Sequence, residues 1–355
     1  MRIIKMELAL LRSKFRGSML GVLVGDCVGS PYEGEETLTP DMKTVLQQSF
    51  DKLERTEFKA PVMQFTVDSA MTQSLAESLV DRKSLDIVDV ARRFVKSYYQ
   101  DPSRGYGISV VTVFQKLQAN KLTDTISPAK EQYNGLGSFG NGGAMRVAPL
   151  SLFCYNDHNK LIDYVKKETE ITHTHKWGIN GAILQALAVQ QSINLNPNEE
   201  LNVSSFVDNL IDKMDKIEVD QTEDYLELDE GLYKDQLCTI KELISEDSDC
   251  PHDEKVVQTL GVGLNALYSV PTAIFCFLRA QRPIKGIKTD NPLRRAIQYA
   301  ITLGGDTDTV ASMTGAIAGA FYGEEKFSPL LLEHCEASEQ FRELADKLLD
   351  RATQE

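Results

Sequence analysis

Residues 15–29 read Phe-Arg-Gly-Ser-Met-Leu-Gly-Val-Leu-Val-Gly-Asp-Cys-Val-Gly, with a glycine at every fourth position, at 17, 21, 25 and 29. Residues four apart share one face of a helix, so this face carries almost no side chains. The pattern recurs near the other end of the chain, at Gly315, Gly319 and Gly323. Bare faces let two helix backbones approach closely. We therefore expect both helices to lie in the core and to bring their ends to one site.

The rest of the chain also favours helices. Almost every periodic segment has helical spacing, and alternating β-branched runs are scarce, so the sequence predicts an all-α fold. The chain has 355 residues, of which 42% are hydrophobic and 25% charged, an ordinary globular composition. No repeat or compositional shift divides it. We expect one domain over residues 1–355, with an N-terminal extension at 1–14 and an acidic, irregular surface insertion at 217–254.

Composition excludes several classes of protein. The net charge of −14 argues against direct nucleic-acid binding. No apolar stretch reaches the roughly 20 residues needed to cross a bilayer, so we expect no membrane partner. The six cysteines are scattered without zinc-ligand spacing, which favours free thiols in an intracellular compartment. Five of the first 16 residues are basic against one acid, so a mitochondrial leader is an alternative to a first amphipathic helix there.

Residues 304–309, Gly-Gly-Asp-Thr-Asp-Thr, are the main candidate for a metal site. Carboxylate and hydroxyl oxygens are hard ligands that suit Mg²⁺, Mn²⁺ or Ca²⁺, and the glycines allow the turn that makes such side chains converge. A plain helix N-cap explains this stretch alone equally well. Residues 66–69, Thr-Val-Asp-Ser, offer the same chemistry far upstream. Together the two stretches supply enough oxygens for two divalent ions that share a carboxylate.

Residues 135–143 form the densest glycine stretch. It contains G-x-G-x-x-G, but no strand precedes it, so we do not interpret it as a dinucleotide-binding fingerprint. Its backbone amides, placed before a helix expected to begin at Ala144, can hold a phosphate, and a flexible connector is the alternative. Asp26 lies among apolar and glycine neighbours, so we expect it to be buried with a partner. His173 and His175 do not share a helix face, which favours hydrogen bonding over metal ligation.

Four stretches in this order resemble the ADP-ribosyl-acceptor hydrolases, the ADP-ribosylglycohydrolase family. They are residues 25–33 (GDCVGSPYE), 66–69 (T-x-D-S), 137–146 (GSFGNGGAMR) and 304–309 (GGDTDT). The similarity is greatest to the serine-specific branch, which also degrades poly(ADP-ribose), and it spans about residues 15–345. It implies a compact orthogonal multi-helix bundle with a central metal cleft that holds two Mg²⁺ ions. The implied reaction is hydrolysis of the glycosidic bond at C1″ of the distal ribose.

The resemblance also implies roles for individual residues. Thr66, Asp68 and Asp308 would bind one ion, and Asp306, Asp308 and Thr309 the other. Glu33 would lie on a mobile flap, and either Glu33 or Asp306 would be the general base. The implied substrate-binding residues are Asp26, Gly105, Tyr133, Leu136, Gly137, Ser138, Phe139, Gly140, Asn141, Gly142, His173 and Leu264. Within this set, residues 136–142 would clasp the diphosphate and distal ribose, while Tyr133 and His173 would line the adenosine side.

One position departs from the family pattern. Thr-Asp-Asp is usual where this chain has Thr66-Val67-Asp68, so an anionic ligand is replaced by an aliphatic side chain, which should weaken metal binding. We expect a Mg²⁺-dependent hydrolase of serine-linked ADP-ribose and poly(ADP-ribose), acting in DNA repair. The alternatives are an arginine-specific hydrolase, an ADP-ribose-binding relative without turnover, and a Ca²⁺-stabilised scaffold. The expected state is a monomer, located in the nucleus, the cytoplasm and the mitochondrial matrix.

Overall fold

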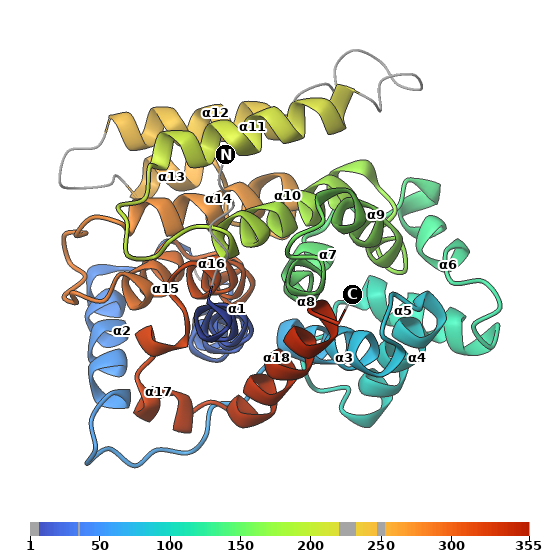
Figure 1. Cartoon of the computed structure of the whole chain (residues 1–355), viewed down its shortest axis with the longest axis horizontal. Helices are drawn as coiled ribbons and strands as arrows, with labels where there is room; N and C mark the ends of the chain where they lie inside the picture. The colour runs from blue at the N-terminus through green and yellow to red at the C-terminus, as the bar shows by residue number, and fades with distance from the viewer. Residues whose placement is uncertain (1–6, 35, 220–231, 247–252, 355) are drawn as a thin grey trace.

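Two glycine-faced helices, α1 (Leu8–Gly29) and α16 (Thr307–Tyr322), lie antiparallel at the centre of the protein (Figure 1). In this computed structural model, a Cβ atom added to Gly21 would lie 1.9 Å from the carbonyl oxygen of Gly315. One added to Gly319 would lie 1.8 Å from the carbonyl oxygen of Gly17. Backbone therefore packs directly on backbone along the whole contact. The predicted close approach of the two helices is confirmed.

The structure describes residues 7–34, 36–219, 232–246 and 253–354. Its helices are α1, η1 (Ser30–Tyr32), α2 (Pro40–Leu53), α3 (Val67–Arg82), α4 (Ile87–Gln100), α5 (Ile108–Ala119), α6 (Ser127–Lys130), η2 (Gln132–Gly135), α7 (Gly142–Met145), α8 (Ala148–Phe153), α9 (His158–Thr169), α10 (Lys176–Ile193), α11 (Val203–Val219), α12 (Leu232–Ser245), α13 (Asp253–Thr259), α14 (Ala266–Arg279), α15 (Pro292–Thr302), α16, η5 (Glu324–Lys326), α17 (Pro329–Glu333) and α18 (Ser338–Ala352). These ranges contain no β-strand, only isolated bridges between Met63 and Cys335 and between Gly140 and Asn265. The predicted all-α fold is confirmed.

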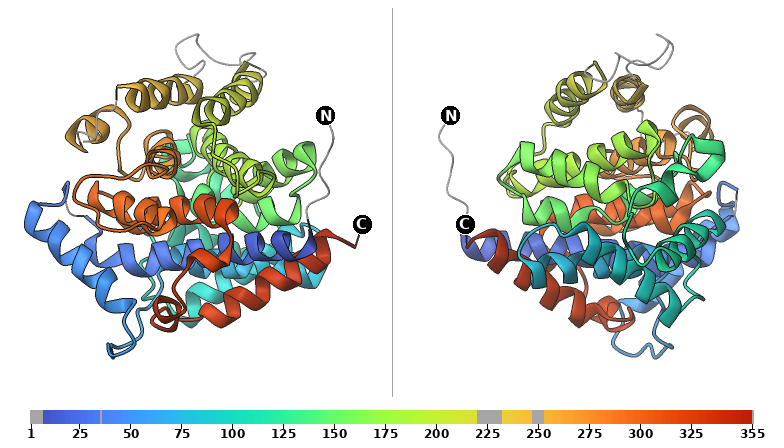
Figure 2. Two further views of the ribbon diagram at one scale, coloured as in Figure 1. Left: turned by 60° about the vertical axis from the view of Figure 1, so that its left-hand side comes forward. Right: turned by 90° about the vertical axis from the view of Figure 1, so that its right-hand side faces the viewer.

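The other helices enclose the central pair. Helices α14 and α15 pack against α16, and α18 packs against α1. Helix α10 crosses above the central pair, which Figure 1 shows end-on, and α3, α4 and α5 lie to one side. Helices α11 and α12 form an outer layer, as both views of Figure 2 show. The crossing directions give the expected multi-helix bundle with its core around α1 and α16.

Polar residues stand at the N-caps of α3 and α15. Thr66 stands at the N-cap of α3, and the Asn291 side chain accepts hydrogen bonds from the backbone N–H groups of Leu293 and Arg294 at the start of α15. The expected irregular structure over 217–254 is wrong for Leu232–Ser245, which form α12. That helix buries Tyr233, Leu237 and Ile240, so tertiary packing prevails over a polar sequence. The remainder of that segment includes 220–231 and 247–252, outside the described residues.

Residues 8–14, set apart above as an extension, are the first turns of α1. Lys14 is buried, and its ammonium donates hydrogen bonds to the carbonyl oxygens of Ser192 (3.1 Å), Ile193 (2.9 Å) and Leu195. These carbonyls lie at the C-terminal end of α10, where a cation satisfies orphan acceptors and complements the helix dipole. The first turns of α1 thus fasten α10 over the central pair. No helix in the described part of the chain is both long and apolar enough to cross a membrane.

The bare helix faces make a stability prediction. Gly315→Ala should cost more than about 3 kcal/mol in the free energy of unfolding, because its Cβ would lie 2.1 Å from the carbonyl oxygen of Gly21, and neither backbone can move aside. Gly263→Ala is the matched control, since nothing lies within 4 Å of a Cβ there. Urea unfolding followed by circular dichroism measures both variants. Equal stability of the two variants would contradict the backbone-on-backbone contact.

Candidate active site

The first half of the site is the N-terminal end of α3. Asp26, on the last turn of α1, is fully buried, and its carboxylate accepts hydrogen bonds from the backbone N–H of Thr66 (3.0 and 3.2 Å), the Thr66 hydroxyl (2.7 Å) and the Ser69 N–H (3.0 Å). Asp26 thereby acts as the capping acceptor of α3, supplied by another helix. Burial raises the pKa of Asp26, although these hydrogen bonds favour its charged form. The partners that we expected for a buried Asp26 are therefore these hydrogen-bond donors of Thr66 and Ser69.

A second set of contacts holds the chain just before α3. The Arg104 guanidinium pairs with both carboxylate oxygens of Glu336 (2.6 and 2.8 Å) and donates to the carbonyl of Phe65 (2.8 Å). Glu336 in turn accepts from the Phe65 N–H at 3.1 Å, and the carbonyl of Arg104 accepts from the Val67 N–H at 2.7 Å. The backbone around Thr66 is thus fixed from both sides, which fixes the direction of its hydroxyl.

The second half of the site is the N-terminal end of α16. Gly304 and Gly305 both have positive φ angles, 76° and 72°, which glycine adopts without strain. A side chain at either position would also collide with a carbonyl oxygen, that of Glu36 for Gly304 and that of Val262 for Gly305, because each oxygen lies 2.4 Å from the place a Cβ would take. Asp306 is the N-cap residue, and its N–H donates to the Val262 carbonyl at 2.8 Å. The turn therefore presents Asp306 and Asp308 toward α3.

The two helix ends meet in a cluster of carboxylates. The Thr66 hydroxyl lies 3.3 Å from Oδ2 of Asp68 and 3.5 Å from Oδ2 of Asp308. Carboxylate oxygens of Asp26, Asp68 and Asp308 all lie within 4.8 Å of one another. Thr309 is also buried, and its side chain hydrogen-bonds with Asp68. The structure thus brings together all five predicted metal ligands, Thr66, Asp68, Asp306, Asp308 and Thr309.

The electrostatics of the cluster favour a cation. Burial, and then the charges of Asp26 and Asp306, raise the pKa of Asp68 well above its usual range. Burial, followed by the charges of Asp68 and Asp306, raises the pKa of Asp308 to about 10. Oδ1 of Asp68 is buried without a hydrogen-bond partner, and within the described ranges no lysine or arginine pairs with these acids. Oxygen ligands without a compensating cation fit hard divalent ions such as Mg²⁺.

Glu33 borders the cluster from an exposed loop after α1. Carboxylate oxygens of Glu33, Asp306 and Asp308 also lie within 4.8 Å of one another. The N–H of Gly34 donates to the carbonyl of Gly305 at 2.9 Å, which ties this loop to the turn before α16. Partial burial, then the charges of Asp306 and Asp26, raise the pKa of Glu33. A carboxyl with a raised pKa beside a metal-ligand cluster is suited to acid–base chemistry.

The glycine-rich loop reaches the cluster through Asn141. Its side-chain amide donates to Oδ2 of Asp306 at 2.7 Å and to the Ser269 hydroxyl at 3.1 Å. The loop is pinned to residues 264–266 by two backbone bonds, from the Asn141 N–H to the Leu264 carbonyl (2.9 Å) and from the Ala266 N–H to the Phe139 carbonyl (3.1 Å). The helix that follows, α7, begins at Gly142 rather than at Ala144 and is a single turn. The loop is thus a rigid wall beside the carboxylates.

Exposed apolar side chains mark the outer part of this wall. Tyr133, Leu136, Phe139 and Leu264 are 49%, 69%, 39% and 68% exposed, and the rings of Tyr133 and Phe139 lie 5.8 Å apart. Such a patch can receive a flat aromatic ring. The remaining loop residues predicted to bind substrate, Gly137, Ser138, Gly140 and Gly142, connect the patch to Asn141. His173 lies behind Gly142, where a Cβ would approach its ring within 2.6 Å.

Two predicted substrate residues differ from the rest. Gly105 lies in an exposed turn between α4 and α5 with a φ of 82°, and the carbonyl of its neighbour Arg104 accepts from the Val67 N–H. Asp26 has no exposed surface, so its hydrogen bonds give it a structural role, and a direct substrate contact stays a prediction. Val67 packs with its partly buried side chain on the core and brings no oxygen to the cluster.

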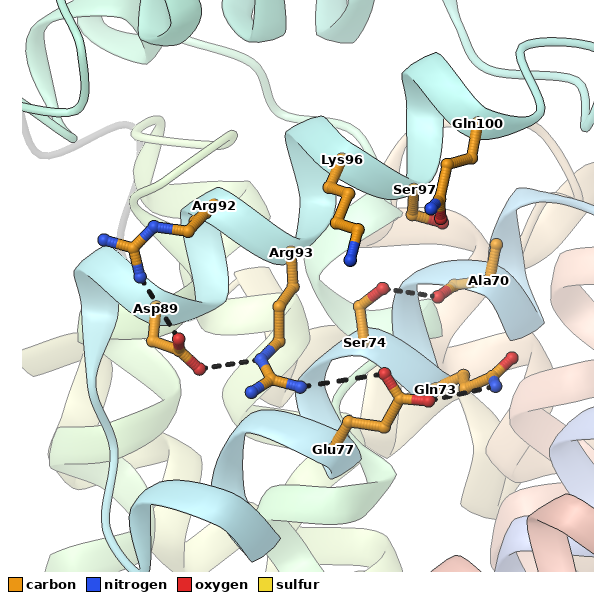
Figure 3. A pocket seen from close by; sticks show the side chains of 10 residues that line it. All are labelled: Ala70, Gln73, Ser74, Glu77, Asp89, Arg92, Arg93, Lys96, Ser97 and Gln100. Carbon is orange, nitrogen blue, oxygen red and sulfur yellow. Dashed lines mark hydrogen bonds and ion pairs between the residues drawn. The ribbon is translucent and has the colours of Figure 1, made fainter.

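A separate groove lies between α3 and α4 (Figure 3). It encloses about 350 Å³, and its lining includes Gln73, Glu77, Asp89, Arg93 and Lys96. Its charged groups largely satisfy one another: Arg93 donates to Asp89 at 2.7 Å, and Gln73 donates to Glu77 at 3.1 Å. The lining contains none of the clustered carboxylates. The cluster, and not this groove, is the candidate active site.

Several residues of the site gave no signal in the sequence. Ser269 supports Asn141, Val262 holds Asp306 in place, and Arg104 with Glu336 fixes the backbone before α3. Each acts on a residue far away in the chain, 128 positions from Ser269 to Asn141 and 232 from Arg104 to Glu336. No local motif marks such pairs, so a single sequence contains nothing from which to infer them.

Comparisons with known proteins agree with this arrangement. The family model described as ADP-ribosylglycohydrolase matches residues 7–355. The chain is 42% identical over 350 residues to the protein named ADP-ribosylhydrolase ARH3 of Bos taurus, covering 95% of this chain and 92% of the relative. It is 42% identical over 349 residues to ADP-ribosylhydrolase ARH3 of Homo sapiens, covering 95% and 93%. A solved structure titled ADP-ribosylglycohydrolase-related protein complex has a TM-score of 0.67 at 19% identity, covering 98% of this chain and 100% of that chain, which supports the fold.

Burial of the cluster, together with repulsion among its carboxylates, predicts how the metal-free protein responds to pH. The pKa of Asp308, about 10 when folded against 3.8 ordinarily, means that its proton stabilises the fold fully below about pH 3.8 and that this stability is lost as pH rises toward 10. In EDTA, the melting temperature should therefore fall between about pH 6 and 9, and Asp308→Asn should flatten that fall. Asp350→Asn, which removes an exposed carboxylate of α18, is the control.

The same thermal scans test the cation. Saturating Mg²⁺ should raise the melting temperature of the unaltered protein by about 5 °C and that of Asp308→Asn by much less, because ligand binding to the folded state stabilises it. A cation site at this cluster would be contradicted if Mg²⁺ left the melting temperature unchanged and if the melting temperature fell equally with pH in the unaltered protein and in Asp308→Asn.

Proposed function

This chain belongs to the ADP-ribosylglycohydrolase family, and we propose that it is a Mg²⁺-dependent hydrolase that removes serine-linked ADP-ribose from proteins and degrades poly(ADP-ribose). The bond cleaved would be the glycosidic bond at C1″ of the distal ribose. Membership of the family and the similarity to ADP-ribosylhydrolases support hydrolysis of ADP-ribose linkages as the class of reaction. Mg²⁺, the serine linkage and the polymer are the finer parts of the proposal.

The observation that carries the proposal is the unsatisfied carboxylate of Asp68. It is 1% exposed, one of its oxygens has no hydrogen-bond partner, and the carboxylates of Asp26 and Asp308 have oxygens within 4.8 Å of it. An anionic group buried in this way costs several kcal/mol unless a cation compensates it. In a protein that is otherwise well packed, a destabilising buried carboxylate of this kind is expected at a functional site.

The residues fit two divalent ions. Thr66, Asp68 and Asp308 would hold one, and Asp306, Asp308 and Thr309 the other. When bound, such a pair would orient ribose oxygens and lower the pKa of a water molecule. The chain's own contribution is to fix these oxygens before binding: Asp26 and Arg104 hold the start of α3, and Val262 holds the start of α16.

We assign the role of general base to Glu33. One oxygen of Asp306 already accepts the Asn141 amide, whereas no hydrogen bond to the Glu33 carboxylate is present in the described structure, and partial burial raises the pKa of Glu33. Glu33 can therefore take a proton from the attacking water as the bond to C1″ breaks. Its exposed loop, tied to the site by the Gly34 N–H, is suited to open and close over a substrate.

The wall formed by residues 133–142 would receive the remainder of ADP-ribose. Its backbone amides and Asn141 would face the diphosphate and distal ribose, while Tyr133 and Phe139 offer rings for the adenine. His173 and Leu264 complete this side. Free ADP-ribose, serine-ADP-ribosylated proteins and poly(ADP-ribose) are thus the proposed ligands.

Val67 supports a second candidate function, that of an ADP-ribose-binding protein without turnover. An apolar side chain stands where the family has a carboxylate, so one ion would lose an anionic ligand and bind more weakly. An arginine-specific hydrolase is a third candidate, since no described residue distinguishes the two linkages. A monomeric state, a role in DNA repair, and a nuclear, cytoplasmic or mitochondrial location stay predictions.

Release of ADP-ribose from a serine-modified peptide tests the function directly. The unaltered chain should release it with Mg²⁺ and stop in EDTA. Val67→Asp should lower the Mg²⁺ concentration required at half-maximal rate by about tenfold or more, because it restores an anionic ligand. Val67→Asn, of similar shape without the charge, is the control. Binding of ADP-ribose without release by the unaltered protein, and release by Val67→Asp, would identify the chain as a binder; no release by either would overturn the hydrolase.

Glu33→Gln should lower kcat by about 100-fold or more, since a positioned base typically contributes that much. The dissociation constant for Mg²⁺, measured by calorimetry, should stay unchanged if Glu33 acts on the water and not on the metal. Glu36→Gln, an exposed acid on the same loop, is the control and should retain full activity. Full activity of Glu33→Gln would contradict this assignment and would favour Asp306 as the general base.

A further inference from the structure

A buried arginine lies directly behind the glycine-rich loop. Arg146 has no exposed surface, and its Nε donates to the carboxylate of Glu168, which is also fully buried. A second guanidinium nitrogen, Nη1, donates to the hydroxyl oxygen of Thr172 at 2.7 Å. The positive end of this pair therefore points toward Thr172, and nothing in the proposed reaction uses it.

The Thr172 hydroxyl has a second neighbour, Nδ1 of His173, at 2.6 Å. Thr172 is 1% exposed, so its hydroxyl hydrogen must be donated inside the protein. A guanidinium can only donate, and it occupies one lone pair of the hydroxyl oxygen. The hydrogen of Thr172 is therefore left for Nδ1, which must accept it. A neutral imidazole that accepts at Nδ1 carries its own proton on Nε2.

We propose that Arg146 and Thr172 are positioning residues that set the tautomer of His173, so that its Nε2–H is a fixed neutral donor to an oxygen of the ligand bound by residues 137–142. The identity of the ligand rests on the function proposed above, whereas the tautomer of His173 does not depend on it. The oxygen belongs to a phosphate or a ribose hydroxyl, since both accept a hydrogen bond from a neutral N–H.

The position of the ring supports this role. A Cβ at Gly142 would lie 2.9 Å from Nε2 of His173, and one at Gly140 would lie 3.4 Å from it. The Nε2 edge therefore borders the two loop glycines, and within the described structure this nitrogen has no hydrogen-bond partner. A donor at the edge of a glycine-rich wall, with its other nitrogen already occupied, is available to a ligand.

The surroundings also keep the ring neutral. Burial and then the nearby charge of Arg146 lower the pKa of His173 to about 3. The ring thus presents the same donor throughout the physiological pH range. Arg146 pairs with Glu168 inside the protein and reaches the ring through its hydrogen bond to Thr172.

The tautomer is measured by NMR of protein labelled with ¹⁵N at its five histidines, with His173→Asn identifying the signal. We expect the unaltered metal-free protein to show the proton on Nε2 and to show no titration of this ring between about pH 5.5 and 8. Thr172→Val, of equal shape but without the hydroxyl, should give a mixture of tautomers, and Thr172→Ser should restore the single one. A proton on Nδ1 in the unaltered protein, or an unchanged spectrum in Thr172→Val, would overturn the proposal.

Calorimetry with ADP-ribose tests the consequence for binding. Thr172→Val should weaken it about two- to tenfold, the net value of one hydrogen bond, while Mg²⁺ affinity stays unchanged and Thr172→Ser binds normally. If Thr172→Val weakens the binding of both ADP and ADP-ribose, the accepting oxygen lies in the ADP portion of the ligand. If it weakens the binding of ADP-ribose alone, the oxygen lies on the distal ribose. Either result supports the proposal. Equal binding by Thr172→Val would overturn the donor role. If the unaltered protein binds no ADP-ribose, the proposed function fails, whereas the NMR result still decides the tautomer.

Discussion

The backbone contact between α1 and α16 is the constraint on which the rest of the protein depends. Because the helices are antiparallel, the last turn of α1 meets the first turn of α16: a Cβ at Gly29 would lie 2.8 Å from the Cα atom of Asp308, and the Thr307 hydroxyl donates to the Gly29 carbonyl at 2.9 Å. This contact brings Asp26 and Asp308 together from opposite ends of the chain. The site is therefore a product of the tightest packing in the core, and not of a flexible surface.

That packing imposes an electrostatic cost. Four carboxylates, Asp26, Asp68, Asp306 and Asp308, are buried within two overlapping clusters without a basic partner among the described residues. Asp26 accepts hydrogen bonds from Thr66 and Ser69, whereas Oδ1 of Asp68 is buried without a partner. The carboxylates other than Asp26 are held where they repel one another by the supports at Arg104, Val262 and Asn141, which act on backbone or on a single oxygen. This repulsion lowers the stability of the metal-free fold, but it comes from a set of cation ligands that is already in place before a cation binds.

The sequence allowed good prediction wherever the signal is local. The four-residue glycine spacing and the two oxygen-rich stretches, at 66–69 and 304–309, each act within one turn or one helix. Prediction failed where packing between distant segments decides: α12 forms in a polar stretch because Tyr233, Leu237 and Ile240 find a core. The link from Asn141 to Asp306 joins residues more than 160 positions apart, and the ion pair of Arg104 with Glu336 joins residues more than 230 positions apart. A single sequence contains no trace of such pairs.

The antiparallel glycine pair also has a consequence for how the protein is made. Helix α1 is synthesised before α16, and their contact joins residues about 300 positions apart. A contact of such separation forms late, because the chain between must be ordered first. During synthesis the glycine face of α1 cannot pair with α16 until about 300 further residues have been added. Folding of the core, and with it assembly of the site, therefore requires that α16 has been synthesised.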